Sequence, residues 1–144
     1  MIVFNDVQAV YSETLDEEIS AISKVMKSGR YILGEQTEQF EESFSNLHGA
    51  KYGIACSSGT AALHLALACH DFPRGKKVLV PAVSFFASAA AIRYAGLEPV
   101  FVDVDDNGLL NLDLLDEISA KDIVAIMPVY LHGRKFNTIR LAEI

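Results

Sequence analysis

Apolar runs and helical patterns alternate along most of the chain, from residue 52 to residue 127. Strands are predicted at 52–56, 77–80, 98–102 and 123–127, and helices between them at 59–70, 84–95 and 112–119. This alternation is typical of βαβ units with parallel strands. The hydrophobic content of 51% suits a sheet that is covered on both faces. The sequence therefore predicts an α/β fold, with three layers and a mostly parallel sheet that carries helices on both faces.

The first 50 residues have a different pattern, which is helical throughout. Thr14 and Glu17 have the spacing of a capping box. An apolar stripe then follows at helical spacing, formed by Leu15, Ile19, Ile22 and Met26. These signals predict a helix over 15–28 and a second helix from Thr37 to near Gly49. We interpret residues 1–144 as one domain, with a helical N-terminal segment of about 1–50 and a βαβ core of about 51–144.

Charge and cysteine content narrow the class of protein. The net charge is −7, from 12 Lys and Arg against 19 Asp and Glu, with no basic block, so nucleic acid is not an expected partner. The uncharged stretch 78–92 is too short to span a bilayer, and the N-terminus does not have the pattern of a signal peptide. Two cysteines without CxxC spacing fit a reduced, cytoplasmic protein.

The most specific local motif lies where the first predicted strand meets the first helix of the core. Ser57, Ser58, Gly59 and Thr60 form a hydroxyl-rich turn at this helix start. A helix N-terminus offers unpaired N–H groups and a positive dipole end, which together favour a phosphate group. The alternative is an ordinary N-cap formed by Ser58 or Thr60. The turn matches neither the GxxxxGK[ST] nor the GxGxxG phosphate pattern.

Two further strand ends carry polar or aromatic residues, in segments 81–86 and 128–133. Carboxyl ends of parallel strands meet at one edge of a sheet, which is where α/β proteins bind ligands. Phe85 or Phe86 could lie flat on a planar cofactor ring, although core packing is favoured for one of the two. His132 is interpreted as a loop or core histidine. No metal site is predicted.

Five segments in chain order resemble the DegT/StrS family of sugar aminotransferases, which are fold-type I enzymes dependent on pyridoxal 5′-phosphate. The resemblance extends from about residue 14 to the last residue. The matching segments are Gly34 with Phe40-Glu41, Cys56–Leu63, Val80–Ile92, Gly96–Asp105 and Ile126–Gly133. Two departures occur: Ser57 stands at the family's Asn position, and Tyr130 and His132 exchange the family's His and Tyr.

The resemblance implies roles for the matched residues. Ser58, Gly59 and Thr60 would hold the phosphate of pyridoxal 5′-phosphate, and Phe85 would stack on its pyridine ring. The implied partners are a nucleotide sugar, an amino-acid donor such as glutamate, and further copies of the chain in a homodimer or a higher oligomer. The implied process is the biosynthesis of surface polysaccharides or amino sugars.

The family's catalytic lysine and the aspartate that pairs with the pyridine nitrogen have no match in this chain. We therefore expect it to be the N-terminal part of a fold-type I large domain, with no catalytic residue of its own and no activity alone. One alternative is a sugar dehydratase of the same family. Another is a non-catalytic module that binds a phosphate-bearing ligand or a partner.

Overall fold

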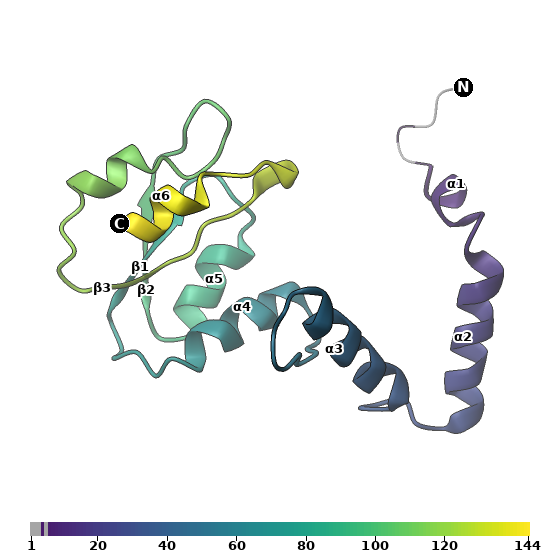
Figure 1. The fold of residues 1–144 in the computed structure, drawn as a ribbon. Helices are drawn as coiled ribbons and strands as arrows, with labels where there is room; N and C mark the ends of the chain where they lie inside the picture. Colours follow the sequence, from purple (N-terminus) through teal and green to yellow (C-terminus); the bar gives the residue numbers. More distant parts are fainter. Residues whose placement is uncertain (1–3, 5) are drawn as a thin grey trace. The chain divides into compact units, whose positions relative to one another are not determined.

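The structure, a computed structural model, describes residue 4 and residues 6–144 (Figure 1). The chain divides into two compact units, residues 1–55 and residues 56–144. The described residues of the first unit form three helices, and the second unit holds the sheet. Within the described residues, no helix is long and apolar enough to cross a membrane.

The helices of the first unit are α1 (Val7–Tyr11), α2 (Leu15–Ser28) and α3 (Glu35–Leu47). The bounds predicted for α2 are confirmed, because Gly29 has the left-handed backbone that ends a helix, with φ of +68°. The predicted capping box is wrong. Thr14 has a helical backbone, so its hydroxyl caps no backbone N–H and instead donates to Glu18 Oε1 at 2.8 Å.

The second unit is built on three parallel strands in the order β2-β1-β3. They are β1 (Lys77–Pro81), β2 (Glu98–Val102) and β3 (Ile123–Ile126). Its helical elements are α4 (Gly59–Ala68), α5 (Ala87–Tyr94), the 3₁₀ turns η1 (Asp113–Glu117) and η2 (Leu131–Gly133), and α6 (Thr138–Glu143). Lys77 pairs with Glu98 on one side and with Ile123 on the other, where a bulge follows before Val78.

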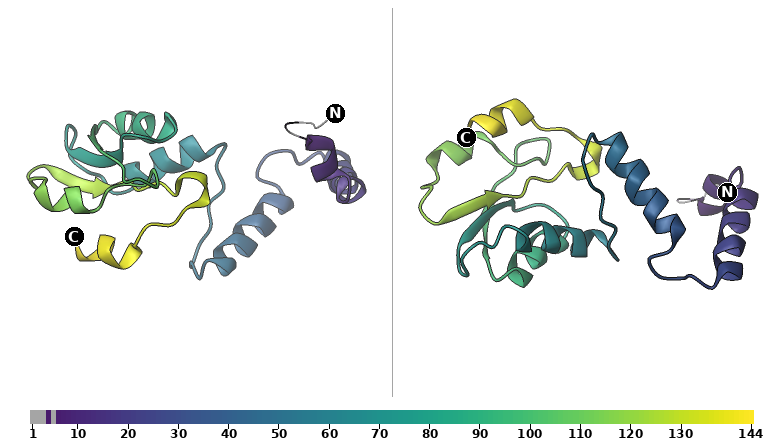
Figure 2. Two further views of the ribbon diagram at one scale, coloured as in Figure 1. Left: turned by 90° about the horizontal axis from the view of Figure 1, so that it is seen from above. Right: turned by 60° about the horizontal axis from the view of Figure 1, so that its bottom comes forward.

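The side chains of β1 alternate between two apolar clusters, one on each face of the sheet. Val78 and Val80 are fully buried in a cluster with Leu67 of α4 and Ile92 of α5. Leu79 faces the opposite cluster, which contains Val102 and Leu115 and the half-buried Leu141 of α6. Figure 2 shows α4 and α5 on one face and η1 and α6 on the other. The predicted parallel sheet with helices on both faces is confirmed.

Three predicted elements differ from the observed ones. Residues 52–56 form no strand, because they have no pairing partner within the described residues, and Ile54 is 84% exposed. The helix predicted at 84–95 begins only at Ala87. The helix predicted at 112–119 is the shorter 3₁₀ turn η1, since a repeat of three residues per turn aligns Leu112, Leu115 and Ile118 with the apolar cluster below.

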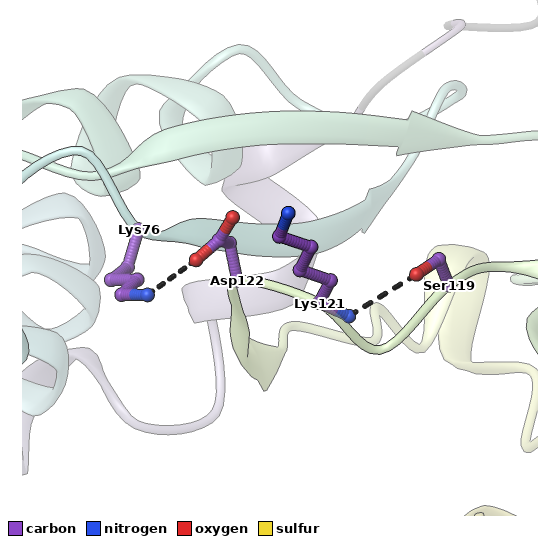
Figure 3. A network of polar contacts seen from close by, with 4 residues as sticks. All are labelled: Lys76, Ser119, Lys121 and Asp122. Atoms are coloured by element: carbon purple, nitrogen blue, oxygen red, sulfur yellow. Dashed lines mark hydrogen bonds and ion pairs between the residues drawn. The ribbon is translucent and has the colours of Figure 1, made fainter.

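An ion pair ties together the amino ends of β1 and β3 (Figure 3). Lys76 Nζ pairs with Asp122 Oδ1, and the backbone N–H of Lys77 donates to the carbonyl of Asp122 at 2.8 Å. The hydrogen bond and the charge of Lys76 hold the pKa of the Asp122 carboxyl below its ordinary value of 3.8. A lowered folded-state pKa stabilises the fold above pH 3.8, and this contribution is lost as the pH falls through the lower value.

We expect Asp122→Asn to lower the free energy of unfolding slightly at neutral pH and to leave it unchanged in strong acid. Asn tolerates the left-handed backbone of this position, where φ is +69°, so the substitution removes the charge with little strain. Urea unfolding of both proteins across the acid range measures the difference. In the Lys76→Met background the difference should vanish at every pH. A difference that persists in strong acid would contradict the ion pair as its source.

Candidate functional site

The turn before α4 folds as a capped helix start. Ser58 has an extended backbone, and its Oγ accepts a hydrogen bond from the N–H of Ala61 at 3.1 Å. The carbonyl of Ser58 accepts the N–H of Ala62 at 2.9 Å. The N-cap interpretation is thus correct for Ser58. The amides of Gly59 and Thr60 come first in the helix and have no intrahelical acceptor, so they are available to a ligand.

The backbone at Gly59 lies beside open space. A Cβ built on this glycine would meet no atom of the chain within 4 Å, and its φ is not in the left-handed range. Neither packing nor backbone strain within this chain therefore requires glycine here. A tetrahedral anion would fit against the exposed amide, where the helix dipole favours negative charge. Thr60, half-buried beside it, adds a hydroxyl to the same turn.

Phe85 and Phe86 lie in the segment between β1 and α5. Both rings are 75% exposed, so the expectation that one of them packs in the core is wrong for this chain. The buried side of α5 consists of small residues and one isoleucine: Ala87, Ser88, Ala90, Ala91 and Ile92. Helix α5 packs against α4 and β1, and the two phenylalanines lie in the loop that precedes α5, where a planar ligand could contact them.

The topology brings the turn and the two phenylalanines to the same end of the sheet. Residues 69–76 connect α4 to the start of β1, and residues 82–86 connect the end of β1 to α5. Both helices therefore run opposite to β1, and both begin at its carboxyl end. Figure 2 shows the start of α4 and η2 at the end toward which the strands point. In η2, His132 and Gly133 both have positive φ, at +55° and +74°.

The lysines of the second unit lie elsewhere. Three of them, Lys76, Lys77 and Lys121, flank the amino ends of β1 and β3, at the opposite edge from α4's start (Figure 3). The fourth, Lys135, lines a separate cavity of about 700 Å³ between the 105–113 loop and the start of α6. No group of three or more potential metal ligands occurs within the described residues.

One contact near the turn could not be derived from sequence spacing. In the first unit, Glu41 Oε1 accepts the backbone N–H of Ala55 at 2.7 Å. A Cβ at Gly53 would lie only 2.4 Å from the carbonyl oxygen of Glu41. The only indication of this contact in the sequence is the Phe40-Glu41 pair. It belongs to a family motif, but the motif assigns Glu41 no role.

The model of the DegT/DnrJ/EryC1/StrS aminotransferase family matches residues 13–144. The chain belongs to this family. It is 36% identical over 129 residues to the UDP-N-acetyl-3-dehydro-α-D-glucosamine 3-aminotransferase of Acidithiobacillus ferrooxidans, a match that covers 89% of this chain and 35% of that protein. The resemblance to the sugar aminotransferase family is confirmed.

Two solved structures share the fold of this chain. A DegT/DnrJ/EryC1/StrS aminotransferase from Brucella abortus matches with a TM-score of 0.91 and 34% identity, over 99% of this chain and 40% of that one. The E. coli GDP-4-keto-6-deoxy-D-mannose-3-dehydratase, solved with bound hydrated pyridoxal 5′-phosphate, matches with a TM-score of 0.81 and 27% identity, over 99% and 36%. The chain thus has the fold of these two proteins and spans less than half of their length.

Proposed function

We propose that this family member is the N-terminal portion of a pyridoxal 5′-phosphate-dependent aminotransferase that acts in the cytoplasm on a keto-sugar nucleotide. Glutamate is the proposed amino donor, and the proposed process is the biosynthesis of surface polysaccharides or amino sugars. The observation that carries the proposal is the start of α4. There, two helix amides without intrahelical acceptors adjoin the open space beside Gly59, in a chain of the sugar aminotransferase family.

The turn would bind the phosphate through several donors. The amides of Gly59 and Thr60 would donate to phosphate oxygens, and the helix dipole would stabilise their charge. Ser58 can act both as the helix N-cap and as a phosphate ligand, because its Oγ accepts the N–H of Ala61 while its O–H remains a donor. The Thr60 hydroxyl would supply a further donor. Charge-assisted hydrogen bonds of this kind are stronger than neutral ones.

Phe85 would orient the cofactor ring. Its exposed side chain, at the end of the sheet where α4 begins, would lie against the pyridine face and exclude water from it. The bound cofactor would supply the electron sink for proton removal from the substrate. The residue that moves that proton is the catalytic lysine, which we place outside these 144 residues because no lysine here matches the family's lysine segment.

We also propose that the protein functions as a homodimer. The apolar stripe of α2 supports an assembly, since Leu15, Ile19, Ile22 and Met26 are between 49% and 64% exposed within this chain. Exposed apolar stripes of this kind mark surfaces that another surface covers.

The activity can be tested on the full-length protein with glutamate and a panel of UDP-, dTDP- and GDP-linked keto sugars. Mass spectrometry of the sugar product separates the two enzymatic candidates. A product that has gained an amino group supports aminotransfer. The second candidate is a sugar dehydratase, which the likeness to the E. coli dehydratase supports. A product that has lost water without gaining nitrogen would identify this activity. If no sugar is converted while amino acids exchange their amino groups, the proposed substrate class is wrong.

A further inference from the structure

We propose that Glu41 is a positioning residue for the phosphate-binding turn. Its carboxylate fixes the backbone of residues 53–55, and these residues lead directly into Cys56 and the turn at Ser57–Thr60. This inference rests on the proposed function, in which that turn holds the phosphate of pyridoxal 5′-phosphate.

The backbone of segment 52–56 depends on other contacts because, in the part of the chain that the structure describes, it has no hydrogen bonds to a neighbouring strand. It has no regular secondary structure, and it pairs with no strand within the described residues. A backbone N–H that is removed from water without an acceptor is destabilising. Glu41 provides the acceptor for Ala55 at 2.7 Å, and both residues are half-buried. A carboxylate forms a stronger bond to this N–H than a neutral carbonyl would.

A second contact holds the same segment two residues earlier. The position of a Cβ on Gly53 lies 2.4 Å from the carbonyl oxygen of Glu41 and 3.1 Å from its carbonyl carbon. The segment therefore crosses α3 in direct backbone contact at Glu41. Gly53 thus lies against the backbone of Glu41, and Ala55 is hydrogen-bonded to its carboxylate. One residue of α3 thus fixes the segment at two points.

The anchored segment is short enough to affect ligand binding. Ala55 lies three residues before the N-cap Ser58, so little chain separates the anchor from the amides of Gly59 and Thr60. A site whose donors are already ordered loses less entropy when it binds its ligand. Releasing Ala55 would let residues 53–57 sample other conformations, and the affinity for the phosphate would fall even though Glu41 never touches it.

The test compares pyridoxal 5′-phosphate with pyridoxal, which lacks the phosphate, on the apo form of the full-length protein. The ratio of the two affinities isolates the contribution of the phosphate. We expect Glu41→Ala to lower this ratio about tenfold, as expected for one lost hydrogen bond to a charged group. Glu41→Gln should restore most of the ratio, since its side-chain oxygen still accepts the N–H of Ala55. Glu41→Asp keeps the charge but shortens the reach, so its ratio should resemble that of Glu41→Ala.

Thr60→Val serves as the reference variant for the turn itself. If Thr60→Val lowers the ratio while Glu41→Ala and Glu41→Asp leave it unchanged, the positioning role is overturned and the proposed phosphate site stands. If Thr60→Val also leaves the ratio unchanged, both proposals fail. A lowered melting temperature with an unchanged ratio would assign Glu41 a structural role alone. Should Glu41→Ala not fold, the contrast between Glu41→Asp and Glu41→Gln decides the question by the same ratio.

Discussion

The 144-residue chain alone is expected to transfer no amino group from glutamate to any keto-sugar nucleotide. An aminotransferase that uses pyridoxal 5′-phosphate requires a lysine that bonds to the cofactor and moves the proton, and no lysine here stands in a segment that matches the family's lysine motif. Three of the four lysines of the second unit lie at the amino edge of the sheet, away from the start of α4. Enzymes typically accelerate their reactions by at least about a millionfold over the uncatalysed rate. We expect this chain to show none of that rate enhancement.

A product assay on the chain, with the full-length protein as positive control, measures this directly. Borohydride reduction after addition of pyridoxal 5′-phosphate, followed by peptide mass mapping, locates any lysine that bonds to the cofactor. Scattered, substoichiometric labelling of exposed lysines is the expected pattern. Stoichiometric labelling of one lysine, together with turnover that its substitution abolishes, would show that the catalytic residue lies within these 144 residues.

In the full-length protein, Thr60→Val is expected to weaken binding of pyridoxal 5′-phosphate by about tenfold to a hundredfold. The substitution keeps the volume of the side chain and removes one hydroxyl, and a hydrogen bond to a charged group contributes about 1.5–3 kcal/mol. Gly59→Val should weaken binding further. Its branched side chain would enter the space that is open beside the helix start, where an added Cβ meets no atom of this chain within 4 Å. Titration of the apo protein by cofactor fluorescence measures both affinities.

Ser58→Ala is the matched control for the role of the turn in stability. Ser58 caps Ala61, so its loss should lower the free energy of unfolding by about 1 kcal/mol. Thr60→Val should leave the melting temperature nearly unchanged, because Thr60 is not the N-cap. A lowered melting temperature with unchanged cofactor affinity in Thr60→Val would remove this residue from the cofactor contacts.

Sequence patterns predicted the elements whose signals are local. Helix α2 has the predicted bounds because an apolar stripe and a terminal glycine define it within one segment. Strand β2 also has the predicted bounds, which follow from a short apolar run between turn residues. Segment 52–56 has the same kind of composition but forms no strand here. Strand formation depends on a partner elsewhere in the chain, which composition does not reveal.

In the candidate site too, local features could be predicted from the sequence, and features that depend on distant residues could not. The turn at Ser58–Thr60 could be predicted because a helix start and its hydroxyls are adjacent in sequence. The exposure of both Phe85 and Phe86 could not, because it depends on how the small residues of α5 pack against α4. The bond from Ala55 to Glu41 joins residues 14 positions apart and needs the folded path of the chain between them. Family motifs identified Glu41 as notable without indicating what it contacts.

The central claim is that the start of α4 holds the phosphate of the cofactor. A crystal structure of the full-length protein with pyridoxal 5′-phosphate tests it most directly. The account predicts phosphate oxygens within hydrogen-bonding distance of the amides of Gly59 and Thr60, with the ring of Phe85 against the pyridine face. A phosphate bound elsewhere, with Gly59 and Thr60 in contact with solvent alone, would contradict it.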